Sequence, residues 1–136
     1  MIPRHGEVWL VDMGMAAKTR PAVVLIADNL NAPRSLIIHI PVTKQNRGSE
    51  LEVPLGHLPF LDPESVANVQ GIGSLPSVRF EKRLGVLPNT DLKAVKAALQ
   101  KACALYRSRN LGLKDATPLT LSGRAPETFS RQRRGG

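Results

Sequence analysis

The stretch RPAVVLI at residues 20–26, followed by LIIHIPVTK at residues 36–44, decides the fold of this 136-residue chain. Both runs are rich in β-branched residues and are bounded by turn-forming residues, which predicts two strands. If the strands pair as an antiparallel hairpin, the start of the first lies beside the end of the second. Arg20, Thr43 and Lys44 then gather at one end of a sheet. A guanidinium, a hydroxyl and an ammonium in this arrangement suit a phosphate that carries developing charge.

Shorter segments on both sides predict further strands, and proline makes the second of them a candidate edge strand. Their ranges are 6–12, 51–55, 65–70 and 83–87. Residues 72–82 are ambiguous, with a possible helical turn near 77–80. After that the apolar spacing becomes helical, which predicts a helix over residues 91–107 that is capped by Asn89 or Thr90. Short strands followed by one helix predict an α+β domain built on a small, strongly curved antiparallel barrel.

The charge of the chain indicates an anionic partner. Nineteen Lys and Arg against eleven Asp and Glu give a net charge of +8, which favours nucleic acid. Aromatic residues are few, so recognition should depend on backbone charge and hydrogen bonds more than on stacking. A single cysteine excludes an internal disulfide and fits a reducing compartment. No apolar run approaches the roughly 20 residues that span a bilayer, and none forms a secretory leader. We expect a cytoplasmic protein with no membrane partner.

The regular pattern ends near Ser108. Beyond it, basic residues outnumber acidic ones, and prolines and glycines interrupt the sequence. This composition predicts a folded domain over residues 1–108 and a basic, disordered tail over residues 109–136. Extra attraction for RNA and a spacer without a task are both open as roles of the tail.

The order of the segments resembles that of MazF/PemK toxins over residues 4–107. The matching segments are GEVWLVD (6–12), RPAVVL (20–25), PVT (41–43), Gln70 and KRLGVL (82–87), followed by the closing helix. The resemblance implies an SH3-like barrel of the CcdB/MazF type with one long C-terminal helix, and a homodimer.

The resemblance also implies an activity. Members of this family are sequence-specific, metal-independent endoribonucleases (mRNA interferases) of bacterial type II toxin–antitoxin systems. They cleave single-stranded RNA to 2′,3′-cyclic phosphate and 5′-hydroxyl ends without a cofactor. A cognate antitoxin with an acidic disordered segment blocks the RNA groove, and toxin and antitoxin together bind DNA.

The family's functional residues transfer onto particular positions of this chain. The catalytic arginine falls on Arg20 and the catalytic Ser/Thr falls on Thr43. Gln70 falls where contact with RNA is expected, and we expect Lys18, Lys44 and Arg83 to bind the substrate as well (Lys44 replaces a small serine that is common there). An arginine is a poor base because its pKa exceeds about 12, so we assign Arg20 to charge stabilisation.

One role in that chemistry stays unassigned. Many relatives carry an acidic residue or a histidine between the first two strands, but MGMAAKT at residues 13–19 has neither. His39 shares a strand face with Thr43, yet four residues place it about 13 Å away, so we expect a partly exposed histidine without a catalytic role. The general base is therefore open.

Several single residues have simpler structural interpretations. Cys103 follows the apolar face of the helix and is expected to be buried filler. No histidine or cysteine set has the spacing of a metal site, so we expect no metal. Arg20 has a structural alternative, an ion pair with Asp12 or Asp28.

Two rival functions remain open for the whole chain. One is a CcdB-like toxin that binds DNA gyrase and cuts nothing. The other is a non-catalytic RNA-binding barrel, or a degenerate toxin that only binds its antitoxin.

Overall fold

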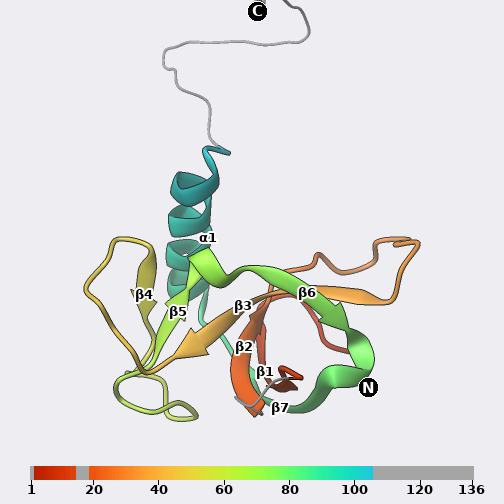
Figure 1. Ribbon diagram of the computed structural model, residues 1–136, viewed down its shortest axis with the longest axis horizontal. Helices are drawn as coiled ribbons and strands as arrows, with labels where there is room; N and C mark the ends of the chain where they lie inside the picture. The colour runs from red at the N-terminus through yellow and green to blue at the C-terminus, as the bar shows by residue number, and fades with distance from the viewer. Residues whose placement is uncertain (1, 15–18, 106–136) are drawn as a thin grey trace, which may run out of the picture. The chain divides into compact units, whose positions relative to one another are not determined.

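Seven antiparallel strands and one α-helix lie within residues 2–14 and 19–105, which are the residues described by the computed structural model (Figure 1). Two short 3-10 turns, η1 (Val69–Gly71) and η2 (Ser77–Arg79), interrupt the later strands. The other elements are β1 (Glu7–Asp12), β2 (Thr19–Val24), β3 (Leu36–Thr43), β4 (Glu52–Pro54), β5 (Val66–Asn68), β6 (Gly73–Pro76), β7 (Phe80–Val86) and α1 (Asn89–Cys103). The predicted α+β class is confirmed, and β4 is an edge strand as expected.

Five of the strands form a ring. Strand β1 pairs with β7 and β2, β2 pairs with β3, and β3 pairs with β6. The chain then runs from β6 through η2 directly into β7, so the chain itself, and not a further strand pairing, completes the circuit (Figure 1). This ring is the small curved barrel that the sequence predicts. It encloses one cluster of buried side chains: Trp9, Val11, Ala22, Val24, Ile37 and Phe80.

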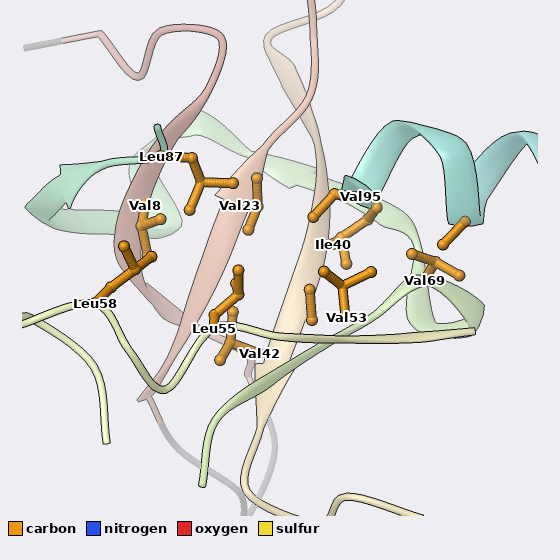
Figure 2. Close-up of a cluster of buried hydrophobic side chains, with 12 residues drawn as sticks. Val8, Val23, Ile40, Val42, Val53, Leu55, Leu58, Val69, Leu87 and Val95 are labelled. Atoms are coloured by element: carbon orange, nitrogen blue, oxygen red, sulfur yellow. The ribbon is translucent and has the colours of Figure 1, made fainter. Parts of the chain in front are cut away.

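The opposite face of β1, β2 and β3 carries a second core (Figure 2). Strands β4 and β5, the loop between them, and α1 cover this face. The members are Val8, Val23, Ile40, Val42, Val53, Leu55, Leu58, Ala67, Val69, Leu87, Val95 and Ala98. Because both faces of the three central strands are covered, their sequences are almost continuously apolar.

Helix α1 packs one face onto this second core. Val95 and Ala98 are buried, and Leu92 and Leu99 pack against the core with part of their surface. This is the predicted helix, and its helical apolar spacing is confirmed from Leu92 to Leu99. The bounds differ, because the helix ends at Cys103 and not at residue 107.

The two ends of α1 are capped by the main chain. Neither Asn89 nor Thr90 caps the helix, so that prediction is wrong. The N-cap is Pro88, which makes no side-chain hydrogen bond but whose carbonyl accepts from Leu92 N at 3.0 Å. At the other end, Ala104 adopts a left-handed conformation with φ of 54°, and its N–H turns back to the last carbonyls.

Two further expectations are corrected by the structure. His39 is buried, because the ring encloses the face that the sequence left open. Its ring meets Phe80 edge to face at 5.7 Å, and its Nδ1 lies 3.1 Å from the Ile37 carbonyl oxygen. Cys103 is exposed and is not buried filler, because the helix extends past the core before it ends.

The ambiguous segment, residues 72–82, resolves into β6 and η2, and β7 begins at Phe80, earlier than expected. The helical turn predicted near residues 77–80 is confirmed. The compact unit spans Met1–Ala104, and the predicted tail over residues 109–136 lies outside the described residues. Within the described ranges, no helix has the length and apolar character that crossing a bilayer demands.

Candidate active site

The register between β2 and β3 determines where Arg20 and Thr43 lie. Ala22 pairs with Pro41, and Val24 pairs with His39, so one step back on β2 is one step forward on β3. Continued to the ends of the two strands, this register sets Arg20 opposite Thr43. Both residues, together with Lys44, line one cleft of about 630 Å³. The structure thus brings together the three groups whose convergence the sequence predicts.

Arg20 is exposed in this cleft. Within residues 2–14 and 19–105, its guanidinium makes no hydrogen bond or ion pair. The two carboxylates considered as structural partners are held elsewhere: Asp12 lies 4.0 Å from Arg79, and Asp28 lies 3.9 Å from Arg4. The described part of the chain therefore gives no support to a structural role for Arg20, and its donors are available to a ligand.

Thr43 ends β3 with its hydroxyl held in place. The Oγ1 atom accepts a hydrogen bond from the backbone N of Gln45 at 3.1 Å, which forms a local turn directly after the strand. A hydroxyl that accepts in this way still has its own proton to donate. Because the residue is half-buried and lines the cleft, that proton can be directed to an anion bound there.

The far wall of the cleft comes from the loop between β4 and β5. This wall consists of Pro59, Phe60, Leu61, Asp62 and Ser65. The Asp62 carboxylate reaches back toward the end of β3, where its Oδ2 lies 3.3 Å from Nζ of Lys44, the residue that follows this strand. The sequence does not predict this wall, because the position of a loop depends on the elements that it connects.

Internal contacts fix this wall. Leu55 and Leu58 are buried in the second core, and successive backbone bonds tie Leu58 to Leu55 and Leu61 to Leu58. The ring of Phe60 lies against Gly85 of β7, so closely that a Cβ there would overlap it. The cleft is therefore a preformed surface between strand ends and an anchored loop.

The charges in the cleft favour an anion. Arg20 and Lys44 contribute two positive charges, and Asp62 contributes one negative charge. Thr43 adds a neutral donor. This set can bind a phosphate diester and stabilise further negative charge on its oxygens.

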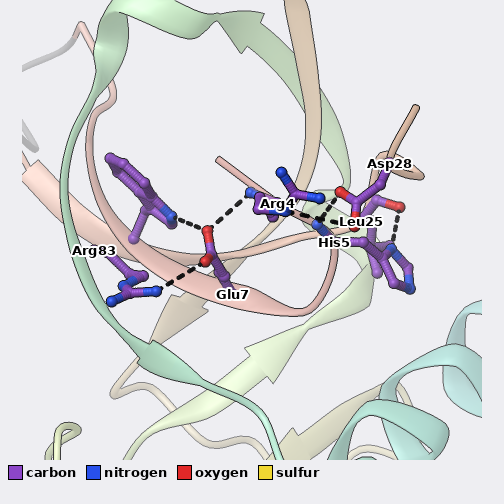
Figure 3. A network of polar contacts seen from close by, with 7 residues as sticks. Arg4, His5, Glu7, Leu25, Asp28 and Arg83 are labelled. Carbon is purple, nitrogen blue, oxygen red and sulfur yellow. Dashed lines mark hydrogen bonds and ion pairs between the residues drawn. The ribbon is translucent and has the colours of Figure 1, made fainter. Parts of the chain in front are cut away.

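The remaining predicted site residues lie apart from this cleft or outside the described residues. Gln70 is exposed in η1 and is not among the lining residues of the cleft. Arg83 lies on β7, where its Nη1 donates to Glu7 Oε2 at 3.2 Å (Figure 3). Lys18 lies outside the described residues, so its predicted contact with RNA stays a prediction.

Glu7 is the centre of the network that holds Arg83. It is buried, and its Oε1 accepts from Trp9 Nε1 at 2.8 Å and from the backbone N of Arg4 at 2.8 Å (Figure 3). Burial raises the pKa of this carboxyl, but the hydrogen bonds from Trp9, Arg4 and Arg83 and the charge of Arg83 outweigh it, and the net pKa lies below its ordinary value. The network ties β1 to β7 and stabilises the ring.

The described residues contain no group of three or more His, Cys, Asp or Glu side chains placed to hold a metal ion. His57 Nε2 lies 2.9 Å from Oδ1 of Asp91, near the start of α1. This contact ties the wall loop to the first turn of the helix.

Comparison with known proteins gives a family match over most of the chain. Residues 4–103 match the family described as PemK-like, MazF-like toxin of type II toxin-antitoxin system. The match spans every strand, the helix and all the residues that line the cleft.

Solved structures with the same fold include several toxins. MazF from Deinococcus radiodurans is 28% identical, with a TM-score of 0.64, over 76% of this chain and 98% of that one. A MazE–MazF structure from Deinococcus radiodurans is 23% identical, with a TM-score of 0.65, over 76% and 96%. An endoribonuclease in complex with its cognate antitoxin from Mycobacterial species is 20% identical, with a TM-score of 0.67, over 76% and 97%. The last two likenesses show the fold.

Proposed function

Because this chain belongs to the PemK-like, MazF-like toxins of type II toxin–antitoxin systems, we propose that it is a sequence-specific endoribonuclease that cleaves single-stranded RNA without a metal ion. The observation that carries the proposal is the meeting of Arg20, Thr43 and Lys44 in one cleft. An endoribonuclease of the same fold gives further support to the assignment.

The proposed reaction uses the RNA's own 2′-hydroxyl as the nucleophile. The 2′-oxygen attacks the adjacent phosphorus, the bond to the 5′-oxygen breaks, and the products carry a 2′,3′-cyclic phosphate and a 5′-hydroxyl. Since the substrate supplies the nucleophile, no metal-bound water is required. The protein has to hold the attacking oxygen in line and stabilise the charge that accumulates on the phosphoryl oxygens.

The residues of the cleft divide this task. The Arg20 guanidinium can bind two phosphoryl oxygens at once, which a lysine cannot do with the same geometry. The Thr43 hydroxyl donates to a third oxygen, and Lys44 adds positive potential beside it. Removing one such preorganised donor typically costs about 3 kcal/mol of barrier.

The partners follow from the same charges. A cleft with two cations at its strand ends suits both RNA and an acidic peptide segment, so we propose that a cognate antitoxin with an acidic disordered segment competes for it. A homodimer and a cytoplasmic location belong to the same proposal. A CcdB-like gyrase poison would not need Arg20 and Thr43 in one cleft, and a non-catalytic RNA-binding barrel would bind RNA there without cutting it.

The test is to incubate the purified full chain with a long RNA in the presence of EDTA and to map the new ends. Discrete cuts with 5′-hydroxyl termini support the proposal. Intact RNA, or cuts that appear only when a divalent metal is added, contradict it. An Arg20→Ala chain purified in the same way controls for a contaminating nuclease.

A further inference from the structure

We propose that Asp62 is the general base that takes the proton from the attacking 2′-hydroxyl, an inference that rests on the proposed ribonuclease function. The chemistry needs such a group, and Arg20 cannot serve because a guanidinium does not release its proton near neutral pH. The loop between β1 and β2 offers no acid or histidine over residues 13–19. The base must therefore come from another part of the cleft.

Asp62 is the carboxylate that the structure places in the cleft. Its Oδ2 lies 3.3 Å from Lys44 Nζ, on the opposite wall from Arg20 and Thr43. No other Asp, Glu or His among the described residues lines this cleft. His39, the other candidate on the same strand as Thr43, is buried inside the ring.

The ion pair with Lys44 places the Asp62 carboxylate near a phosphate that Lys44 would bind. A lysine that contacts a phosphoryl oxygen does so at about 2.8 Å, which leaves the Asp62 carboxylate on the order of 5 Å from that oxygen. An attacking 2′-oxygen lies about 3–3.5 Å from the phosphorus before reaction. An oxygen at that position can lie between the phosphate and Asp62, at the roughly 2.6–3.2 Å that proton transfer requires.

The backbone of Asp62 is fixed while its carboxylate stays accessible. The Asp62 carbonyl accepts from Ser65 N at 3.0 Å, and the Ser65 carbonyl accepts from Leu55 N at 2.9 Å. Ser65 and Leu55 are both buried. The side chain of Asp62 is 62% exposed, so substrate can reach it. An anchored main chain with a reachable functional group is the arrangement that a catalytic base needs.

The step balances without a further reactant. The 2′-O–H proton passes to the Asp62 carboxylate as the 2′-oxygen forms its bond to phosphorus. The bond between phosphorus and the 5′-oxygen breaks, its electron pair goes to that oxygen, and a water molecule supplies the proton that makes the 5′-hydroxyl. The protonated Asp62 then releases its proton to solvent. Arg20 and Lys44 remain protonated throughout.

The loss of a general base from a cationic cleft affects RNA affinity and the cleavage rate differently, which distinguishes this role from that of a residue that only binds RNA. Replacing Asp62 by Asn removes a negative charge that repels the RNA backbone. Binding should hold or tighten while the chemical step slows. A residue that reads a nucleobase would show the opposite pattern, with weaker binding and an altered choice of cleavage site.

The experiment uses an oligonucleotide that carries a cleavage site mapped with the wild-type chain. Single-turnover rates are measured with this RNA, and affinity is measured with the same oligonucleotide carrying one 2′-deoxy nucleotide at the site, which cannot react. For Asp62→Asn we expect the rate to fall by at least about 100-fold, with equal or tighter affinity for the RNA. The matched control is Glu64→Gln, which removes an exposed carboxylate of the same loop that does not line the cleft; it should change both values by less than about threefold.

A second variant tests the role more directly. Asp62→Ala leaves space where the carboxylate was, and added formate should restore part of the rate, which a structural role of Asp62 would not allow. If the Asp62→Asn chain cleaves within about fivefold of the wild-type rate, Asp62 is not the general base, while the proposed ribonuclease function still stands. If the variant instead loses affinity for RNA and cleaves at other sites, Asp62 recognises a nucleobase and is not the general base. A wild-type chain that cuts no RNA overturns both proposals.

Discussion

Arg20 at the start of β2 and Thr43 at the end of β3 stand opposite each other in the continued antiparallel register and line the same cleft. The arrangement depends on that register, because a slip of one residue would turn one of the two side chains to the other face of the sheet. The register is specified by burial: Val23 and Ile40 pair on the face of the second core, and Ala22 and Val24 point into the ring.

Thr43→Val tests the hydroxyl alone, because valine keeps the shape of threonine. We expect RNA cleavage to fall on the order of 100-fold, since a donor to the phosphoryl oxygens is lost. The cost in the free energy of unfolding should be about 1 kcal/mol, because the variant also loses the bond from Gln45 N to Oγ1. Cleavage rates and urea denaturation measure the two effects. Thr43→Ser is the matched control and should keep most of the activity; a valine variant as active as the serine variant would remove the hydroxyl from the mechanism.

Gly85→Ala tests the packing behind the far wall of the cleft. A Cβ at this position would overlap the ring of Phe60, which also lines the cleft. We expect the ring to move, with a destabilisation of about 1–3 kcal/mol and weaker RNA binding. The control is Gly73→Ala, where the nearest atom to an added Cβ is the Gly71 carbonyl oxygen at 3.8 Å. Thermal melting and RNA affinity check the outcome, and equal behaviour of the two alanine variants would show that Phe60 is not held as described.

The central strands could be predicted because their residues report their environment directly. The strand preference is strong for Val23, Val24, Ile37 and Ile40, and each of these side chains is buried in one of the two cores. Strand β6 could not be predicted in the same way. Its sequence, GSLP, has weak strand preference, and the pairing with β3 is what makes it a strand.

The burial of His39 shows a second limit of prediction from the sequence. Alternation along β3 assigns Ile37, His39 and Thr43 correctly to one face, but it does not reveal what covers that face. The ring closes over Ile37 and His39 and leaves Thr43, at the strand end, in the cleft. Asp62 and Phe60 were missed for a related reason, since a loop gives no periodic signal.

The Glu7 network predicts how stability depends on pH. The folded-state pKa of Glu7 lies below its ordinary value of 4.5, so the folded chain binds this proton less tightly than the unfolded chain. The resulting stabilisation is fully present above pH 4.5 and is lost as the pH falls through the lower folded-state pKa. We expect the free energy of unfolding of wild type to fall more steeply below that pH than that of Glu7→Gln. Denaturation series over acidic pH measure the slopes, and identical slopes would contradict the prediction.

Removing the carboxylate altogether tests the same network at neutral pH. Glu7→Ala leaves the buried Trp9 Nε1–H and the Arg4 N–H without their acceptor. We expect a loss of roughly 1–3 kcal/mol in the free energy of unfolding. Glu7→Gln, which keeps one acceptor oxygen, should lose less. An alanine variant as stable as the glutamine variant would show that these hydrogen bonds do not stabilise the ring.

The most direct test of the account is the rate of RNA cleavage by Arg20→Ala compared with wild type, measured in EDTA at a mapped site, with thermal melting as the check on folding. The control is Arg34→Ala, an exposed arginine that does not line the cleft. We predict that Arg20→Ala loses at least about 100-fold in rate. It should melt like wild type, because the guanidinium makes no hydrogen bond or ion pair within the described residues, and Arg34→Ala should cleave normally. A folded Arg20→Ala chain that cleaves RNA as fast as the Arg34→Ala chain would contradict the account.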